Sequence, residues 1–162
     1  MKGLAVLLLC MSQWACNPGR EPVVESQTIR VLHSSSQCMP GAASGIRIIG
    51  NPAELSTLWQ DLHRMQLDSV PAPTADFHDS YLVLINMGQQ STAGYVLKMD
   101  ATAYVLRDHV AVIPVQWREP EPGSMQAQVI TSPCLLLQVP KGRYTEIEVV
   151  DQQHRLLFRH AV

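Results

Sequence analysis

The densest group of side chains that could bind a metal ion or transfer protons is the run Asp76-Phe77-His78-Asp79. Carboxylate and imidazole groups one or two residues apart could share a divalent cation. Asp is also a common turn residue, and an apolar run begins shortly afterwards at Tyr81. None of the six histidines forms the H-x-x-x-H pattern of a helical metal site. We therefore interpret the run as a turn and predict no metal site.

Other catalytic motifs are incomplete. Ser44 lies in the sequence G-A-A-S-G, which differs from the G-x-S-x-G of a nucleophile elbow. The segment between Gly88 and Gly94 lacks the lysine of a phosphate-binding loop, and a strand is expected where such a loop requires a helix. Glu119 and Glu121 alternate with prolines, which is more typical of solvated loop charges than of an acid–base pair. The sequence favours a protein that is not an enzyme and uses no cofactor.

The N-terminus indicates export. Lys2 precedes an apolar run over residues 4–11. This run is too short for a bilayer, which needs about 20 apolar residues, and it has the form of a secretory signal. A buried terminal helix or strand is the alternative. We expect residues 1–15 to be a signal peptide.

Cys16 is a candidate for lipid attachment. It follows the small residue Ala15 at the end of the signal, a pattern that resembles the bacterial lipobox, in which the cysteine is acylated and becomes the mature N-terminus. Gln13 and Trp14 depart from the usual lipobox residues, and they also fit ordinary signal-peptidase cleavage poorly. Cys10 is a worse candidate, because a large leucine precedes it. The resemblance implies a protein of the bacterial cell envelope, in the periplasm or outer membrane, that contacts the membrane through its lipid anchor only.

The two remaining cysteines, Cys38 and Cys134, are predicted to form a disulfide. An even number of cysteines in an oxidising compartment favours pairing. Two separate buried thiols are the alternative, because a free cysteine packs as a small apolar residue. A metal site on this pair is disfavoured, because neither cysteine has a second ligand nearby in the sequence.

Length and charge set further limits. Removal of residues 1–15 leaves 147 of the 162 residues, which suits one domain with an adequate core. The remaining 11 basic and 14 acidic side chains give a slightly acidic chain, so charge offers no argument for nucleic-acid binding. No further apolar stretch is long enough to cross a membrane.

The first half of the chain is expected to hold a tether, two strands and one helix. Residues 16–27 are polar, contain two prolines and form the anchor and tether. Strands are expected at 28–33 and 44–49. The helix starts at Asn51 or Pro52, and its apolar residues recur at 3.6-residue spacing: Leu55, Leu58, Trp59, Leu62 and Met65.

The second half is expected to be almost entirely strands. Residues 81–87 are nearly all apolar, which predicts a central strand buried on both faces. Pro114 predicts that its own strand lies at an edge or carries a bulge. Asp108-His109 predicts a tight turn, and strands joined by short turns should pair antiparallel. The other strands are expected at 94–99, 103–107, 110–117, 126–139 with an interruption at 132–133, 145–150 and 156–158.

These elements define the expected fold class. About eight short strands and one amphipathic helix indicate a β-rich, mainly antiparallel sandwich or open barrel with the helix packed on it. By strict count the class is α+β. Residues 28–162 are expected to form a single domain.

One pattern in the second half resembles the C-terminal domain of the protease complex subunit PrcB family. A G-Q-Q-S-T-A-G-Y segment at 88–95 follows a hydrophobic strand, T-S-P-C stands at 131–134 and V-P-K-G at 139–142. The resemblance covers about residues 80–150, and a strand and helix over 46–62 are similar to what precedes that domain. Ala93 departs from the glycine often found in the family. The resemblance implies an envelope accessory factor like the lipoprotein partner of a secreted protease complex.

The same pattern nominates a binding site. Gly88 and Gly94 permit backbone angles closed to other residues, Thr92 can bond the local backbone, and Tyr95 combines an aromatic body with a polar tip. A tight hairpin with Tyr95 in the core is the alternative. The predicted binding residues are Gly88, Thr92, Gly94, Tyr95, Trp117, Pro122, Gly123 and Gln128.

A second resemblance gives an alternative function. Residues 91–95 resemble the N-P-T-T-G-Y loop of chagasin-like inhibitors of cysteine proteases, which are β-sandwiches that insert three loops into an active-site cleft. Here the Asn-Pro pair is missing, no G-x-G-G loop occurs, and residues 117–120 do not form the R-P-W loop.

The leading hypothesis is an exported, lipid-anchored, non-enzymatic envelope protein that binds another protein and serves as an accessory subunit of a protease complex. The alternatives are a chagasin-like protease inhibitor, an envelope domain that binds a small ligand, and a small hydrolase or metal enzyme.

Overall fold

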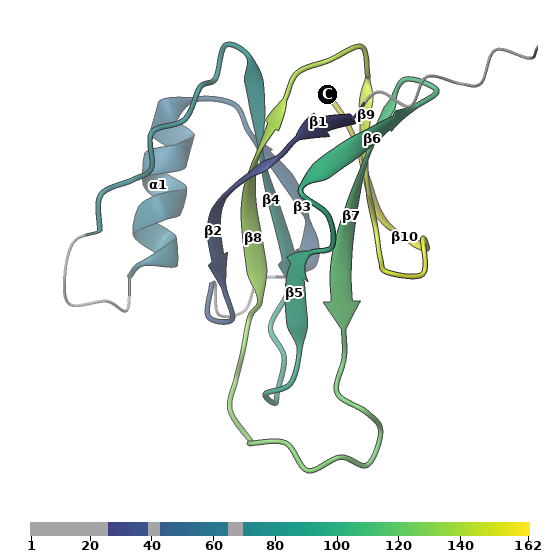
Figure 1. Ribbon diagram of the computed structural model, residues 1–162. Helices are drawn as coiled ribbons and strands as arrows, with labels where there is room; N and C mark the ends of the chain where they lie inside the picture. Colours follow the sequence, from purple (N-terminus) through teal and green to yellow (C-terminus); the bar gives the residue numbers. More distant parts are fainter. Residues whose placement is uncertain (1–25, 39–42, 65–69) are drawn as a thin grey trace, which may run out of the picture.

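The computed structural model describes residues 26–38, 43–64 and 70–162 (Figure 1). The predicted signal peptide at 1–15, the lipid site Cys16 and the helix residue Met65 lie outside the described residues. The described elements are β1 (Ser26–Thr28), β2 (Arg30–Ser35), β3 (Ser44–Ile49), α1 (Pro52–Leu62), β4 (Ser80–Met87), β5 (Val96–Met99), β6 (Ala103–Arg107), β7 (Val110–Arg118), β8 (Cys134–Pro140), β9 (Glu146–Val150) and β10 (Leu156–Ala161).

The strands form two sheets. One sheet has the order β2-β8-β4-β3, and the other has the order β1-β6-β7-β9-β10 with β5 also paired to β7. All pairs are antiparallel except β7 with β9, which are parallel. The predicted β-rich class with one helix is confirmed.

Strands β4 and β8 lie at the centre of the first sheet and are buried on both faces. Val83 and Ile85 of β4 pack into the core between the sheets, while Leu82 and Leu84 point to the opposite face. Side chains of β8 alternate in the same way, because successive residues of a strand face opposite sides. The predicted central strand at 81–87 is therefore confirmed.

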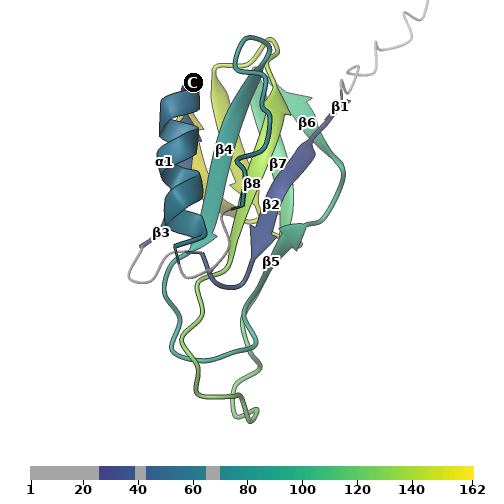
Figure 2. The same cartoon turned by 90° about the vertical axis from the view of Figure 1, so that its left-hand side faces the viewer.

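Helix α1 covers the outer face of the β4–β8 sheet (Figure 2). The Asn51 side chain caps its first turn by accepting a hydrogen bond from the Glu54 amide at 3.0 Å. Glu54 reciprocates by accepting from the Gly50 amide and the Asn51 side chain, so both sides of the cap are satisfied. No helix among the described residues is long and apolar enough to span a bilayer. The predicted apolar stripe packs on the sheet through Leu55, Leu58, Trp59 and Leu62.

Two expectations about strands are wrong. The expected strand at 126–139 is regular only from Cys134, and residues 119–133 form a loop. The strand with Pro114 is not an edge strand, because β7 pairs with β9 on one side and with β5 and β6 on the other, and none of these pairings has the register shift of a bulge. The Pro114 carbonyl accepts from the Asp100 amide in the break between β5 and β6. Since N and C=O of a strand residue point the same way, the missing N–H also faces that break and leaves no strand partner unsatisfied.

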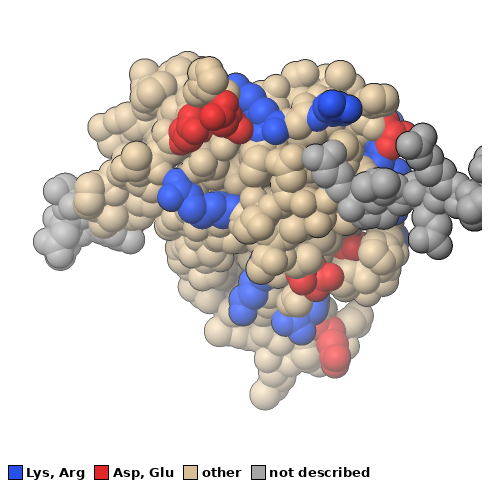
Figure 3. Space-filling view, turned by 45° about the horizontal axis from the view of Figure 1, so that its top comes forward, with Lys and Arg blue, Asp and Glu red and all other residues tan. Residues whose placement is uncertain are grey.

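Two arginines of the described residues form ion pairs with nearby acidic side chains. Arg159 pairs with Glu148 and Glu146, and Arg155 pairs with the buried Asp151. Basic and acidic side chains are interspersed on the face that Figure 3 shows.

The predicted disulfide between Cys38 and Cys134 is present. Its Cα atoms are 6.0 Å apart, and the two residues are separated by 96 positions in the sequence. It links the segment after β2 to the first residue of β8, where the two strands already pair through Ser35 and Cys134. The bond therefore fastens an outer strand of the first sheet to one of its two central strands.

We expect reduction of this disulfide to lower the free energy of unfolding by about 4 kcal/mol, because the cross-link restricts the unfolded chain over a long loop. Urea denaturation with and without a phosphine reductant measures the loss. Alkylation under denaturing conditions should find both thiols blocked before reduction and free after it. Two freely alkylated thiols in unreduced protein would reject the pairing.

Candidate functional site: the paired loops

Two loops protrude side by side from one end of the sandwich (Figures 1 and 2). Residues 88–95 connect β4 to β5, and residues 119–133 connect β7 to β8. We call these two segments the paired loops. They meet because β4 and β8 are antiparallel neighbours, so that the end of β4 lies beside the start of β8 at the pair Asn86 and Cys134.

Hydrogen bonds hold the paired loops together. Gln90 and Thr131 exchange backbone bonds of 2.8 and 2.9 Å, and the Thr131 hydroxyl donates to the Thr92 carbonyl at 3.0 Å. Nearer the tip, the Ala93 amide donates to the Ala127 carbonyl at 3.0 Å. Thr131 is buried, so its bonds are made away from water, where an unpaired polar group is costly. The loops therefore act as one structural unit.

Gly94 lies where the loops touch and has a backbone conformation that favours glycine. Its φ is +95°, and a Cβ at this position would lie 2.6 Å from the Gln126 side-chain oxygen and 3.1 Å from Pro120. Gly88 also has a positive φ, +71°, at the turn out of β4. Both glycines predicted from the sequence thus have the backbone role that was expected of them. Ala93 does not have a positive φ, so the departure from the family pattern causes no strain.

The first of the paired loops is not a hairpin. The sequence left open a tight hairpin at residues 88–95, but β4 and β5 belong to different sheets. The segment is a crossover between the sheets, and its pairing partner is the distant loop 119–133. Local sequence could not reveal this, because the contact joins residues about forty positions apart.

Loop 119–133 exposes apolar side chains. Met125 is 99% exposed, Ile130 is 54% exposed and Val129 is 45% exposed. Met125 contributes no apolar burial to the stability of the fold, and together with Val129 and Ile130 it gives this loop an apolar surface that is open to contact with a partner. These three residues were missed in the sequence, although three large apolar residues within a six-residue loop segment are a signal that could have been used.

Tyr95 and Trp117 are half-buried where the paired loops join the sandwich. Both pack against the core between the sheets. The Trp117 ring meets Phe158 edge to face at 5.6 Å. Its backbone amide donates to the Gln152 side chain, which donates back to the Trp117 carbonyl. These two predicted site residues therefore support the base of the loops rather than the tip.

The turn that holds Gln152 is fixed by a buried carboxylate. Burial of Asp151 opposes its ionisation, but the amides of Arg155 and Gln153 and the Arg155 guanidinium outweigh that effect and keep the Asp151 pKa below 3.8. The charged turn thereby holds the β9–β10 connection against the end of β7.

The other predicted binding residues lie on the loop 119–133. Pro122 and Gly123 are exposed, and Gly123 forms the turn with a φ of +80°. Gln128 is exposed. The structure thus brings Gly88, Thr92, Gly94, Pro122, Gly123 and Gln128 onto the paired loops, with Tyr95 and Trp117 beneath them.

The run Asp76-Phe77-His78-Asp79 is a turn before β4. The Asp76 carboxylate accepts from the amides of His78 and Asp79, which hold its pKa below the ordinary value. Lys141 donates to the carbonyls of Phe77 and His78 and lies 5.1 Å from the ring centre of Tyr81. The V-P-K-G motif noted in the sequence thus braces this turn.

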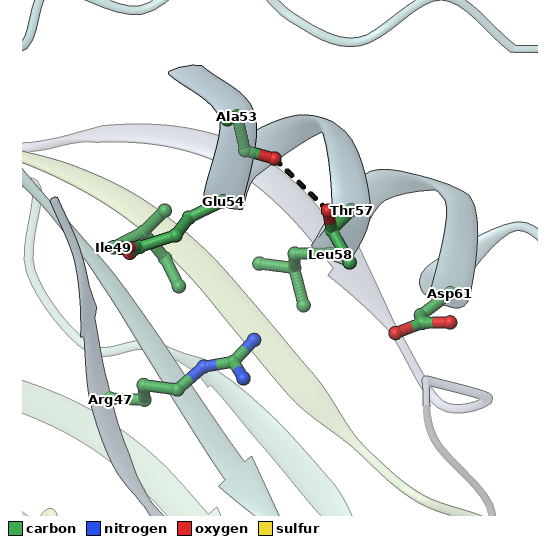
Figure 4. A pocket seen from close by; sticks show the side chains of 7 residues that line it. All are labelled: Arg47, Ile49, Ala53, Glu54, Thr57, Leu58 and Asp61. Atoms are coloured by element: carbon green, nitrogen blue, oxygen red, sulfur yellow. Dashed lines mark hydrogen bonds between the residues drawn. The ribbon is translucent and has the colours of Figure 1, made fainter. Parts of the chain in front are cut away.

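A separate groove of about 430 Å³ lies between β3 and α1 (Figure 4). Ile49 and Leu58 supply apolar surface, and Arg47 points into the groove without a hydrogen bond to the other lining residues (Figure 4). Arg47 gives the groove a cation, while the carboxylates of Glu54 and Asp61 are engaged with the helix cap and with Arg64. Its lining residues are Arg47, Ile49, Ala53, Glu54, Thr57, Leu58 and Asp61.

Residues 81–140 match the family model described as PrcB C-terminal. This segment is similar to the C-terminal domain of PrcB, and we call it the PrcB segment. The match runs from the second residue of β4 to the last residue of β8, so the PrcB segment contains both central strands and both paired loops. No curated protein and no solved structure matches the chain.

We expect Gly94→Ala to destabilise the protein more than Gly123→Ala. Both substitutions place alanine at a positive φ, which costs about 1–2 kcal/mol. A Cβ at Gly94 also meets Gln126 and Pro120, whereas a Cβ at Gly123 has open space around it. Urea denaturation of both variants measures the difference, with Gly45→Ala as an unstrained reference. Equal losses at the two sites would show that the loops do not press together at Gly94.

Proposed function

We propose that this chain is an exported, lipid-anchored envelope protein that binds another protein and acts as a non-enzymatic accessory subunit of a protease complex. The observation that carries the proposal is the pair of protruding loops, braced against each other and with exposed apolar side chains, which lies wholly inside the PrcB segment. Apolar side chains on a well-braced protrusion suit insertion into a pocket of a partner, since little ordering entropy remains to be lost.

Charge narrows the chemistry of the partner. The paired loops contain two acidic residues, Glu119 and Glu121, and no lysine or arginine. Both glutamates are exposed near the base of the loops, while Met125 lies at the tip. The complementary surface is an apolar pocket with basic side chains on its rim.

The N-terminal sequence supports export to the cell envelope. Lys2 with the apolar run up to residue 11 suits an export signal, and Cys16 follows a small residue at its end. A disulfide between Cys38 and Cys134 agrees with an oxidising compartment. A lipid-anchored domain would present the paired loops to a partner at the membrane surface.

We expect Cys16→Ser to abolish incorporation of a fatty-acid label into the protein, because the Cys16 thiol is the proposed attachment site of the lipid. Metabolic labelling of the cells with a clickable fatty acid measures the loss. Cys10→Ser is the matched control and should be labelled like the parent. Labelling of the Cys16→Ser protein at the level of the parent would reject Cys16 as the lipid site.

We expect a photo-reactive amino acid at position 125 to cross-link the chain to one envelope protein in its native cells. The same probe at position 156 is the control, since Leu156 is 52% exposed on β10 and is not part of the paired loops. The double variant M125E/I130E should reduce capture about tenfold or more, because truncation of central interface residues has effects of this size. L156E should leave capture unchanged. Thermal melts establish that the variants are folded.

A captured protease or protease-complex subunit, lost in M125E/I130E, would support the proposal. Equal cross-linking at positions 125 and 156, or capture by the folded double variant at the level of the parent, would overturn the assignment of the loops as the binding surface.

A chagasin-like inhibitor is the second candidate, favoured by one observation. Ser132 exchanges backbone hydrogen bonds with Ser36 and Cys38, so the segment after β2 lies beside loop 119–133 at the same end as loop 88–95. Three chain segments thus meet at one end of the sandwich, as an inhibitor of that kind requires. Stoichiometric inhibition of a papain-like protease by the purified chain distinguishes it from an accessory subunit, which would leave that enzyme active.

A further inference from the structure

A cysteine pair and a histidine come together behind the paired loops. One ring nitrogen of His33 and the sulfur atoms of Cys38 and Cys134 all lie within 4.8 Å of one another. His33 is on β2, Cys38 follows that strand, and Cys134 begins β8. The sequence disfavoured a metal site on the cysteines because no second ligand stands near them, but the pairing of β2 with β8 supplies that ligand through space.

One polar atom of the His33 side chain is buried without a hydrogen-bond partner among the described residues. This atom is Nε2. Buried polar atoms of native proteins are nearly always bonded, so an orphaned nitrogen calls for an explanation such as an ion or a water. Burial and the nearby His63 also lower the pKa of the His33 imidazole.

The surroundings isolate the cluster from solvent. Cys38 is 4% exposed and Cys134 is fully buried. The Trp59 ring of helix α1 lies 5.4 Å from the His33 ring and 4.2 Å from the His63 ring, so an aromatic layer covers the histidine side. His63 Nδ1 lies 2.9 Å from the Trp59 carbonyl, which can only accept, so this nitrogen carries the proton and holds the layer in place.

We propose that reduction of the Cys38–Cys134 disulfide converts this cluster into a binding site for a thiophilic divalent cation such as Zn²⁺, held by the two thiolates and His33. Zinc accepts sulfur and nitrogen ligands in a tetrahedral arrangement, and three protein ligands leave the fourth position for water or another small ligand. The disulfide and the metal site are alternative states of the same two cysteines.

The step balances with a dithiol as the reductant. The dithiol gives two electrons and two protons to the Cys38–Cys134 bond and becomes a disulfide, leaving two cysteine thiols. Binding of Zn²⁺ then releases the two thiol protons and forms two zinc–sulfur bonds. Two thiolates and a neutral imidazole cancel the charge of the cation, which suits a site with so little exposure to water.

The geometry requires only local movement. With zinc–sulfur bonds of about 2.3 Å, two thiolates at a tetrahedral angle stand roughly 3.7 Å apart. Rotation of the two side chains can provide this spacing while the Cα atoms keep their separation of 6.0 Å. The β2–β8 pairing through Ser34 and Leu135 holds both backbones in position.

Cobalt(II) is the probe, because thiolate ligation of this ion gives a charge-transfer band and four-coordination gives strong visible bands. The purified full chain is reduced with a phosphine without oxygen and titrated with Co²⁺. We expect one equivalent to bind, the bands to appear, and Zn²⁺ to displace the cobalt. The unreduced chain should show no bands.

Matched variants test each ligand. His33→Ala should weaken Co²⁺ binding by more than about tenfold, since even removal of a supporting group around a metal ligand has this effect. C38S/C134S should abolish the charge-transfer band. His78→Ala removes an imidazole that is 91% exposed at the turn before β4, and it should bind like the parent.

Two outcomes would overturn the proposal. One is a reduced, folded chain that shows no thiolate–cobalt band, and the other is a His33→Ala protein that binds Co²⁺ as tightly as the parent. If reduction without metal unfolds the chain, added Zn²⁺ must restore its β-sheet circular dichroism, because binding is then coupled to folding. Failure to restore that signal also counts against the site.

Discussion

The structure depends on the pairing of β4 with β8, two strands that are buried on both faces. Because both faces are buried, most side chains of the two strands have no contact with water, so these strands are mainly apolar and need a packing layer above and below. The second sheet provides one layer and α1 provides the other. The antiparallel pairing also places the end of β4 beside the start of β8. The connection that follows β4 and the connection that precedes β8 therefore lie together as the paired loops.

Sequence patterns that span a few residues were sufficient to predict the helix and the central strand. The apolar run at 81–87, the stripe of Leu55, Leu58, Trp59 and Leu62, and the Asn51 cap each depend on local physics, and each has the expected structure. Asp108 and His109 both have positive φ, as a two-residue hairpin turn requires. The disulfide was also predictable, since only two cysteines remained to pair once the N-terminal pair was assigned.

What the sequence could not provide were contacts between distant residues. Pro114 is tolerated at the centre of a sheet because it faces the break between β5 and β6, where no strand partner needs its missing N–H. This arrangement depends on how three strands meet. Loop 88–95 became a crossover instead of a hairpin because its partner is loop 119–133. Tyr95 and Trp117 looked like interface aromatics, but both are partly buried and pack against the core. His33 approaches the cysteine pair only through the register of β2 on β8.

The disulfide also determines how the domain would bear tension at its N-terminus. A pull on Ser26 first meets β1, which holds β6 through three residue pairs, and then β2, which holds β8 through five. Behind these strands the load reaches Cys38, where a covalent bond passes it directly to Cys134 in the centre of the first sheet. Unravelling from a tethered end would therefore stop at residue 38, and the force-bearing path would bypass α1 and β3 and leave the paired loops in their place.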